Sequence, residues 1–327
     1  MRWIAKAPDG RPVEEEVLVD GLATRVALRA AVPANAVLGS RTHGEIGILM
    51  YHRIADRYPD VTTPTWNVTP ERFRRQLGGL VARGFRAWPL LKVVDHARYG
   101  LAVPPRTFMV TFDDGYENVY LNAWPVLREL NIPATIFLAT SFLNSQTPFP
   151  FDDWSEAGSG RVPHHSWRPL TVAQCREMAV DGLLELGAHT HTHADFRNRP
   201  DVFEADLSRC VRFMHEQFGA ASPAFAFPYG TTDLGFAGPA LAAAAKRTGV
   251  RCGLTSDRVL VDPASDPFEW GRFEVSQRDS AATLAAYLDG WYSFAPMDCS
   301  FSRAALTSST CQYMTAPAGL VAKPPGA

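Results

Sequence analysis

Residues 107–115 read Thr-Phe-Met-Val-Thr-Phe-Asp-Asp-Gly, and this stretch gives the plainest indication of the fold. Its first six residues are β-branched, aromatic or otherwise apolar, which favours a buried strand over 107–112. The strand runs directly into Asp113 and Asp114, and the Asp-Gly pair that follows is common turn chemistry. The stretch therefore predicts two neighbouring carboxylates at a strand end, where parallel α/β proteins place their active sites.

The same alternation of strand and helix extends on both sides of this stretch. The spacing predicts about seven strands, at 46–51, 107–112, 134–138, 184–188, 224–227, 251–255 and 272–276. Helices are predicted after Thr69, before about residue 130, and at 171–180, 201–218, 238–247 and 281–290. Short connections between alternating elements favour a parallel sheet covered by helices, either a barrel or a doubly wound sheet.

The two ends of the chain lack this regularity. Residues 1–44 contain a run of three glutamates and a weakly apolar stretch, and we assign them as an N-terminal extension. Residues 45–292 form the main domain. Residues 293–327 lose the periodicity and gain Ser, Thr, Ala and Pro, which indicates a loosely attached tail.

Composition excludes several classes of protein. The 327 residues carry a formal net charge of -2, with 46% hydrophobic and 20% charged residues, which is ordinary for a globular chain and excludes a strongly basic nucleic-acid binder. There is no apolar run of ~18 residues, so no transmembrane segment is predicted. The opening residues lack the apolar stretch of a secretory signal, so we expect a cytoplasmic protein. Five widely spaced cysteines without a Cys-x-x-Cys pair predict reduced, structural thiols.

Residues 189–193 read His-Thr-His-Thr-His and are the strongest chemical signal in the chain. They follow the predicted strand 184–188, so they lie at the same sheet edge as the two carboxylates. If the chain turns helical there, His189 and His193 share a face and hold one metal ion, while His191 points elsewhere. The alternative is a hydrophilic loop with exposed histidines.

The carboxylates and the histidines explain each other. One carboxylate and two imidazoles make an open zinc site with room for water and substrate, and the second carboxylate is then available to deprotonate that water. Taken alone, the acidic pair is read more readily as a turn. A third motif, Phe-Pro-Tyr-Gly at 227–230, follows another predicted strand. It is either a tight turn or a rigid wall whose backbone N–H groups face an oxyanion.

These three motifs, in this order and spacing, resemble those of the polysaccharide deacetylase (NodB-homology) family of carbohydrate esterases. The resemblance covers about residues 45–290. It implies a distorted (β/α) barrel of about seven parallel strands and a divalent metal ion, usually zinc, in an enzyme that removes acetyl groups from N-acetylated sugars. By position, it implies that Asp113 is the catalytic base and that Asp114, His189 and His193 are the metal ligands.

The sequence departs from the family pattern at two places. Many members have an arginine where this chain has Ala226, and many have a late histidine that acts as general acid, whereas no histidine follows His215 here. The early stretch Leu-Met-Tyr-His at 49–52 resembles the subgroup with rearranged motif order that includes poly-N-acetylglucosamine deacetylases of exopolysaccharide systems. That resemblance implies the acid role for His52, and we expect Arg272 to replace the missing arginine.

The sequence therefore predicts a metal-dependent hydrolase of carbon–nitrogen bonds that acts on an N-acetylated glycan. Tyr229 is expected to stabilise the oxyanion through its backbone N–H group. Two alternatives remain open at this point: a hydrolase of a non-sugar amide or imide on the same barrel, and a non-catalytic carbohydrate-binding protein. In the loop over roughly 141–168, Asp152-Asp153-Trp154 and His164-His165 either line a sugar groove or belong to a solvated loop.

Overall fold

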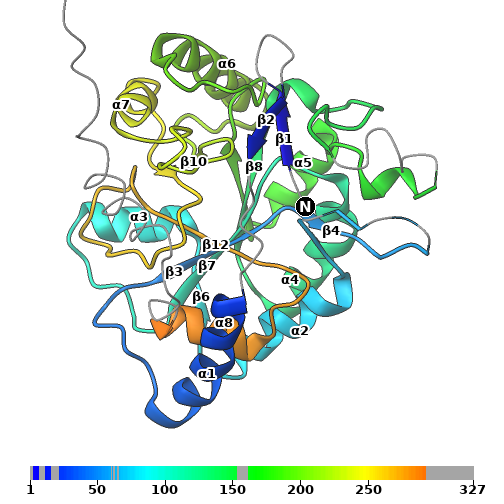
Figure 1. Cartoon of the computed structure of the whole chain (residues 1–327). Helices are drawn as coiled ribbons and strands as arrows, with labels where there is room; N and C mark the ends of the chain where they lie inside the picture. Colours follow the sequence, from blue (N-terminus) through cyan, green and yellow to red (C-terminus); the bar gives the residue numbers. More distant parts are fainter. Residues whose placement is uncertain are drawn as a thin grey trace, which may run out of the picture.

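The computed structural model describes residues 3–6, 12–15, 22–59, 61, 63, 64, 66–152 and 161–291, with side chains from residue 30 onward (Figure 1). The predicted tail 293–327, two of the five cysteines, Asp153 and Trp154 lie outside the described residues. Cys175, Cys210 and Cys252 are buried free thiols, and burial raises the pKa of each to about 12. The limits assigned to the N-terminal extension and the main domain stay predictions.

One curved parallel sheet forms the centre of the molecule (Figure 1). Its strands lie in the order β11-β10-β9-β8-β7-β3-β12, and a short strand β6 pairs with β7 off this path. The predicted (β/α) barrel is thus confirmed as a half-barrel of seven parallel strands, with the first and last strands as neighbours. The bounds are β3 (Gly47–Tyr51), β6 (Arg86–Ala87), β7 (Thr107–Phe112), β8 (Ala134–Leu138), β9 (Leu184–Ala188), β10 (Phe225–Ala226), β11 (Gly253–Leu254) and β12 (Phe273–Glu274).

Irregular chain links the two edges of this sheet. The backbone N–H of Thr255, just after β11, donates to the carbonyl of Trp270 at 2.8 Å. The N–H of Arg272, just before β12, donates to the carbonyl of Asp257 at 2.9 Å. Two loops therefore join β11 to β12 where a ladder would close a regular barrel, and Arg272 is held at that junction.

Helices pack around the sheet, most of them against its outer face. Their bounds are α1 (Leu22–Leu38), α2 (Pro70–Val81), α3 (Leu90–Arg98), α4 (Trp124–Leu130), α5 (Val172–Val180), α6 (Pro200–Phe218), α7 (Pro239–Arg247) and α8 (Ala281–Leu288). A π-helical turn, η1 (Val119–Ala123), precedes α4, and 3-10 turns occur at η2 (Thr140–Phe142) and η3 (His164–Ser166). Among the described residues, no helix combines the length and apolar character needed to cross a membrane. Short pairings lie outside the sheet: β1 (Trp3–Lys6) with β2 (Pro12–Glu15), and β4 (Arg53–Ile54) with β5 (Asn67–Val68).

Local chemistry sets the start of α2. The side chain of Thr69 accepts a hydrogen bond from the N–H of Arg72, and Pro70 occupies the first helical position, where its missing N–H costs nothing. Phe73, Leu77 and Leu80 form the buried stripe that faces the core. This helix confirms the start predicted from the sequence.

The strands are buried on both faces because helices cover one side and the barrel interior fills the other. Leu49, Phe108 and Val110 belong to the cluster that packs against the outer helices. Ile48, Met109 and Phe137 belong to an inner cluster that also includes residues of α3. This alternation with period two decides which residues can reach the interior at the upper ends of the strands.

The helix α3 was not predicted, and its N-terminus shows why. Its N-cap is Pro89, which makes no side-chain cap. Glu185 of β9, which is remote in sequence, accepts from the N–H of Leu91 at 3.2 Å and from the hydroxyl of Thr135 at 2.9 Å. The acceptor for the first turn therefore comes from tertiary structure, so no start signal stands in the local sequence.

Replacing Glu185 with alanine is expected to lower the free energy of unfolding by about 1–3 kcal/mol, because the Leu91 N–H and the Thr135 hydroxyl lose their acceptor. Burial raises the pKa of Glu185, against the smaller lowering effect of its hydrogen bonds. The contribution of Glu185 to the free energy of unfolding is therefore greatest below the pKa of Glu185 in the unfolded chain, about 4.3. It declines as pH rises through the pKa of Glu185 in the folded chain. Glu185→Gln keeps an acceptor without the charge, so it should gain stability relative to wild type with rising pH. Urea unfolding of the three chains across pH 4–8 checks this, and parallel curves for wild type and Glu185→Gln would contradict it.

Candidate active site

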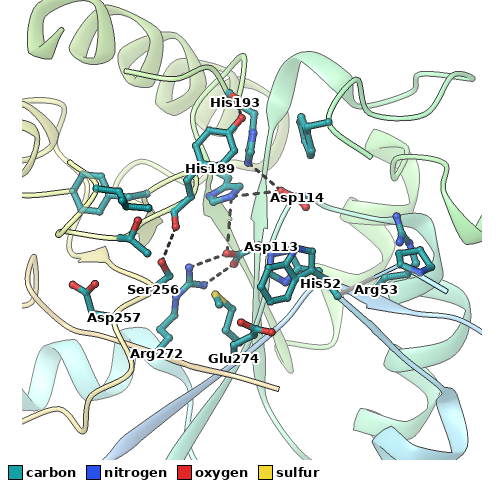
Figure 2. Close-up of a pocket in the computed structure, with 18 of the residues that line it drawn as sticks. His52, Arg53, Asp113, Asp114, His189, His193, Ser256, Asp257, Arg272 and Glu274 are labelled. Atoms are coloured by element: carbon teal, nitrogen blue, oxygen red, sulfur yellow. Dashed lines mark hydrogen bonds and ion pairs between the residues drawn. The ribbon is translucent and has the colours of Figure 1, made fainter. Parts of the chain in front are cut away.

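Side chains along each strand point alternately inward and outward, and this alternation brings the predicted site residues to one place. Along β7, Met109 and Thr111 face the interior, and Asp113 continues the same face two residues beyond. Ile48 belongs to the same inner cluster on β3, and His52 follows it at even spacing. By the same rule His189, after β9, points inward, and Figure 2 shows these side chains converging from separate strand ends.

Asp114, His189 and His193 form a compact group of metal-ligating side chains (Figure 2). One ligand atom from each lies within 4.8 Å of the other two. The Asp114 carboxylate is 3.3 Å from Nε2 of His193 and 3.5 Å from Nε2 of His189. All three residues are buried. Their separations fit a single divalent ion with an open coordination position, as one carboxylate and two imidazoles provide in catalytic zinc sites.

The two histidines are held in different ways. Nδ1 of His189 lies 2.8 Å from the carbonyl of Ala226, so it donates there and leaves the lone pair of Nε2 facing Asp114. Nδ1 of His193 is buried and has no hydrogen-bond partner among the described residues. Its ring lies instead between Phe151, at 4.0 Å between ring centroids, and Tyr229, at 5.0 Å. Burial lowers the pKa of His189 to about 4, which favours the neutral imidazole that binds metals.

The backbone of the histidine motif is not helical, contrary to the condition under which the sequence placed His189 and His193 on one face. Thr190 and His193 adopt left-handed conformations, with φ of 64° and 52°. The loop turns twice and returns His193 to the interior. Asp114 and Tyr229 also have positive φ, at 70° and 63°. Strained conformations of this kind persist only where the surroundings impose them, and here four gather around one site.

His191 points away from the group, as the sequence predicts. Its Nδ1 lies 2.9 Å from the hydroxyl of Thr140 in η2. The backbone N–H of Ser141 donates to the His191 carbonyl at 2.9 Å. His191 therefore ties its loop to η2 and leaves the two flanking histidines to the site.

Asp113 and Arg272 form a buried bidentate pair. The guanidinium donates to the two carboxylate oxygens at 2.6 and 2.8 Å, and Nε of Arg272 donates to the carbonyl of Thr255 at 3.0 Å. Burial alone raises the pKa of Asp113, but Arg272, together with His189, outweighs it and holds the pKa below the usual value. Asp113 is therefore an ionised carboxylate fixed in one orientation, 4.0 Å from Nε2 of His189.

His52 borders the same cavity without joining the metal-ligating group. Its ring stacks on Trp66, with 5.3 Å between centroids. Burial lowers the pKa of His52, and the two carboxylates raise it by less. The next residue, Arg53, forms a buried ion pair with Asp152 and lies over the ring of Tyr116.

The motif at 227–230 forms a tight turn beside His193. The Tyr229 carbonyl accepts from the hydroxyl of Ser256 at 2.6 Å, and the Tyr229 hydroxyl lies 3.5 Å from the carbonyl of His193. Gly230 has φ of 61°, and a Cβ there would lie 2.9 Å from the backbone nitrogen of Ser256. Only glycine fits this close approach. The N–H of Ser256 donates to the Gly230 carbonyl at 2.9 Å, and this bond holds the turn in one conformation.

A cavity of about 550 Å³ opens over these residues (Figure 2). Sequence reasoning missed most of its wall, because Trp66, Phe151, Leu234, Asp257, Arg258 and Glu274 belong to no recognisable motif. The sequence had offered Asp152 as a groove residue, and it does line the cavity, whereas His164 and His165 form a 3-10 turn outside the lining. The lining comprises Met50, His52, Arg53, Pro64, Trp66, Asp113, Asp114, Tyr116, Phe151, Asp152, His189, His193, Phe227, Tyr229, Thr231, Asp233, Leu234, Ser256, Asp257, Arg258, Arg272 and Glu274.

Comparisons with solved structures show the same fold. IcaB from Ammonifex degensii superimposes with a TM-score of 0.62 at 24% identity, over 76% of this chain and 98% of that one. The Streptococcus pyogenes deacetylase PplD, solved in complex with acetate, gives a TM-score of 0.60 at 22% identity, over 75% and 98% of the two chains.

Comparisons of sequence point to one family. The family model for polysaccharide deacetylases matches residues 101–253. A poly-beta-1,6-N-acetyl-D-glucosamine N-deacetylase of Staphylococcus epidermidis is 26% identical over 262 residues, which are 74% of this chain and 83% of the relative. The protein of the same description from Staphylococcus aureus is 23% identical over 236 residues, 69% and 73% of the two chains. Residues 101–253 therefore match the polysaccharide deacetylase family model, and the chain is similar in sequence to deacetylases of poly-beta-1,6-N-acetyl-D-glucosamine.

Proposed function

We propose that this protein removes the N-acetyl group from N-acetylglucosamine units of an exopolysaccharide, with a divalent metal ion, ordinarily zinc, held by Asp114, His189 and His193. The observation that carries the proposal is the position of the Asp113–Arg272 pair directly beside that ligand group, inside one cavity. The reaction breaks the amide C–N bond and joins the oxygen of water to the acetyl carbon. Acetate and a free amino sugar result.

The donor set suits such an ion. One carboxylate and two neutral imidazoles leave positions open for small ligands, and the orientation of His189 by the Ala226 carbonyl is the support that metal-binding histidines usually receive. When bound, the ion supplies Lewis-acid chemistry, polarising a carbonyl and lowering the pKa of water. In this proposal, proton transfer and the positioning of groups are carried out by side chains of the protein.

Asp113 acts as the general base in this proposal. Its carboxylate is ionised, buried and fixed by Arg272, so it can accept a proton from the attacking water without reorienting. Arg272 is then a positioning residue for Asp113. The interaction with the guanidinium explains why a carboxylate can stay charged beside a second carboxylate in the same buried site.

His52 acts as the general acid and donates its proton to the departing amine. It lines the same cavity as the ligand group and stacks on Trp66, which limits the rotation of its ring. The backbone N–H of Tyr229, on a turn made rigid by Gly230 and Ser256, is the donor proposed for the oxyanion.

The cavity also suits a sugar. Its volume lies within the range of small-molecule sites, and the rings of Trp66, Phe151 and Tyr229 offer flat apolar surfaces beside carboxylates that can accept from hydroxyl groups. The description of the staphylococcal relatives names poly-beta-1,6-N-acetyl-D-glucosamine, and we propose a glycan of that class as the substrate.

Acetate release tests the reaction itself. The purified chain, incubated with β-1,6-linked N-acetylglucosamine oligomers, should release acetate, and a chelator should abolish the release. Asp114→Ala should lose bound metal and activity together, with kcat/KM lower by about a hundredfold or more, because one of three ligands is gone. Asp201→Ala, on the exposed first turn of α6, serves as control. Release from small cyclic imides but not from glycans would overturn the choice of substrate.

His52→Ala should keep its metal and lose mainly kcat, by about 10²–10⁴-fold, with KM little changed. The wild-type pH profile should be bell-shaped. Activity requires protonated His52, so it falls as pH rises through the pKa of His52, which burial lowers from the ordinary value. In His52→Ala this alkaline limb should disappear. Full turnover by the variant, measured beside its metal content, would remove His52 from the mechanism.

Arg272→Lys keeps a positive charge but cannot make two parallel hydrogen bonds. We expect kcat to fall by about 10–100-fold at unchanged metal content, because Asp113 loses its fixed orientation. The acidic limb should move to higher pH, since Arg272 holds the pKa of Asp113 below its usual value. Arg212→Lys, exposed on α6, is the matched control. An acidic limb at the wild-type position would contradict the assigned role.

A further inference from the structure

We propose that Asp206 of α6 is a positioning residue that sets the place of His193 in the metal site. The inference rests on the proposed function, because it concerns the same ligand group. Asp206 does not line the cavity, and among the described residues it forms no hydrogen bond with His189 or Asp114. It acts on the loop between the two ligating histidines.

The carboxylate of Asp206 accepts three hydrogen bonds from that loop. One oxygen accepts from the backbone N–H of His191 at 2.6 Å and from that of Thr192 at 3.2 Å. The other accepts from the hydroxyl of Thr192 at 2.8 Å. The loop is not helical, so its backbone supplies no acceptor to these two consecutive N–H groups. The Asp206 side chain satisfies both of them.

These hydrogen bonds support the part of the loop whose backbone conformation is strained. Thr190 and His193, on either side of the two bound N–H groups, both have positive φ. Such conformations persist only under external constraint. The hydroxyl of Thr190 accepts from the N–H of His193 at 3.0 Å, so a shift of the loop centre moves His193 directly. From the opposite side, Thr140 donates its N–H to the Thr190 carbonyl at 3.3 Å.

The difference between the two histidines makes this constraint necessary. The ring of His189 is oriented by its hydrogen bond to the Ala226 carbonyl. The ring of His193 has no such bond among the described residues, because its Nδ1 is buried without a partner. Ring contacts with Phe151 and Tyr229 limit the tilt of the His193 ring, but they do not fix the direction in which a ring nitrogen points. The position of Nε2 in His193 therefore depends on its backbone, and Asp206 holds that backbone from α6.

Metal affinity tests the inference without reference to catalysis. Zn²⁺ is titrated into the full chain in competition with a chromophoric chelator. Asp206→Ala should raise the dissociation constant by about 10–100-fold, the usual effect of losing an outer support of a metal ligand. Asp206→Asn should recover most of the affinity, because its side-chain oxygen still accepts from both N–H groups and its amide can pair with the Thr192 hydroxyl. Glu216→Ala, exposed on the same helix, is the control and should match wild type.

A second readout separates positioning from general stability. The visible spectrum of the Co²⁺-substituted protein reports ligand geometry, so Asp206→Ala should alter it while Glu216→Ala does not. If Asp206→Ala fails to fold, Thr192→Val removes only one of the three bonds and should weaken Zn²⁺ binding by a few fold.

The outcomes are distinct. Wild-type affinity and an unchanged Co²⁺ spectrum in Asp206→Ala, or wild-type affinity in Thr192→Val where Asp206→Ala does not fold, overturn the inference and leave the proposed function standing. Failure of the wild-type chain itself to bind Zn²⁺ overturns the proposed metal site and, with it, the role of Asp206. Loss of affinity in Asp206→Ala with recovery in Asp206→Asn supports the inference.

Discussion

Two consecutive carboxylates, Asp113 and Asp114, are buried side by side at the end of β7, and the arrangement of the site follows from how their charges are satisfied. Adjacent buried carboxylates repel each other, so both stay ionised only if each has its own stabilising partner, a positive charge or a hydrogen-bond donor. Arg272 pairs with Asp113. Asp114 faces two imidazoles, and its pKa is held low by His193, His52 and His189 against the raising effect of burial. The two side chains are therefore held apart in the way that their two proposed roles require, one toward a proton and the other toward a cation.

This separation depends on the parallel sheet. Asp113 continues the inward face of β7, and Asp114 reaches its own position only because its backbone is left-handed. The register of neighbouring strands places His52 level with Asp113, and His189 lies one inward-facing position further along its strand. Arg272 arrives from the junction of β11 and β12, where loops link the two sheet edges. The irregular closure of the barrel is thus the feature that admits a buried arginine to the site.

The position where family members often carry an arginine is taken here by Ala226. Its carbonyl accepts from His189, and it belongs to the inner cluster. Arg272, just before β12, occupies the space beside Asp113 instead. This is consistent with the rearranged motif order, because His52 follows β3 and Arg272 precedes the adjacent strand β12, so both proposed roles lie on that side of the barrel. The two departures from the family pattern therefore have a common structural basis.

The sequence by itself determined the elements and the residue types of the site. Alternating strands and helices, the cap at Thr69 and the acidic and histidine motifs are local patterns, and local patterns are set by propensity and periodicity over a few residues. What only the tertiary structure decided is which distant groups meet. The cap of α3 by Glu185, the stacking of Phe151 on His193, the hold of Asp206 on the histidine loop and the pairing of Arg272 with Asp113 each join segments far apart in the chain. The helical turn on which the sequence made a shared face for His189 and His193 conditional is absent for the same reason, because contacts from η2 and α6 impose left-handed residues that no local propensity favours.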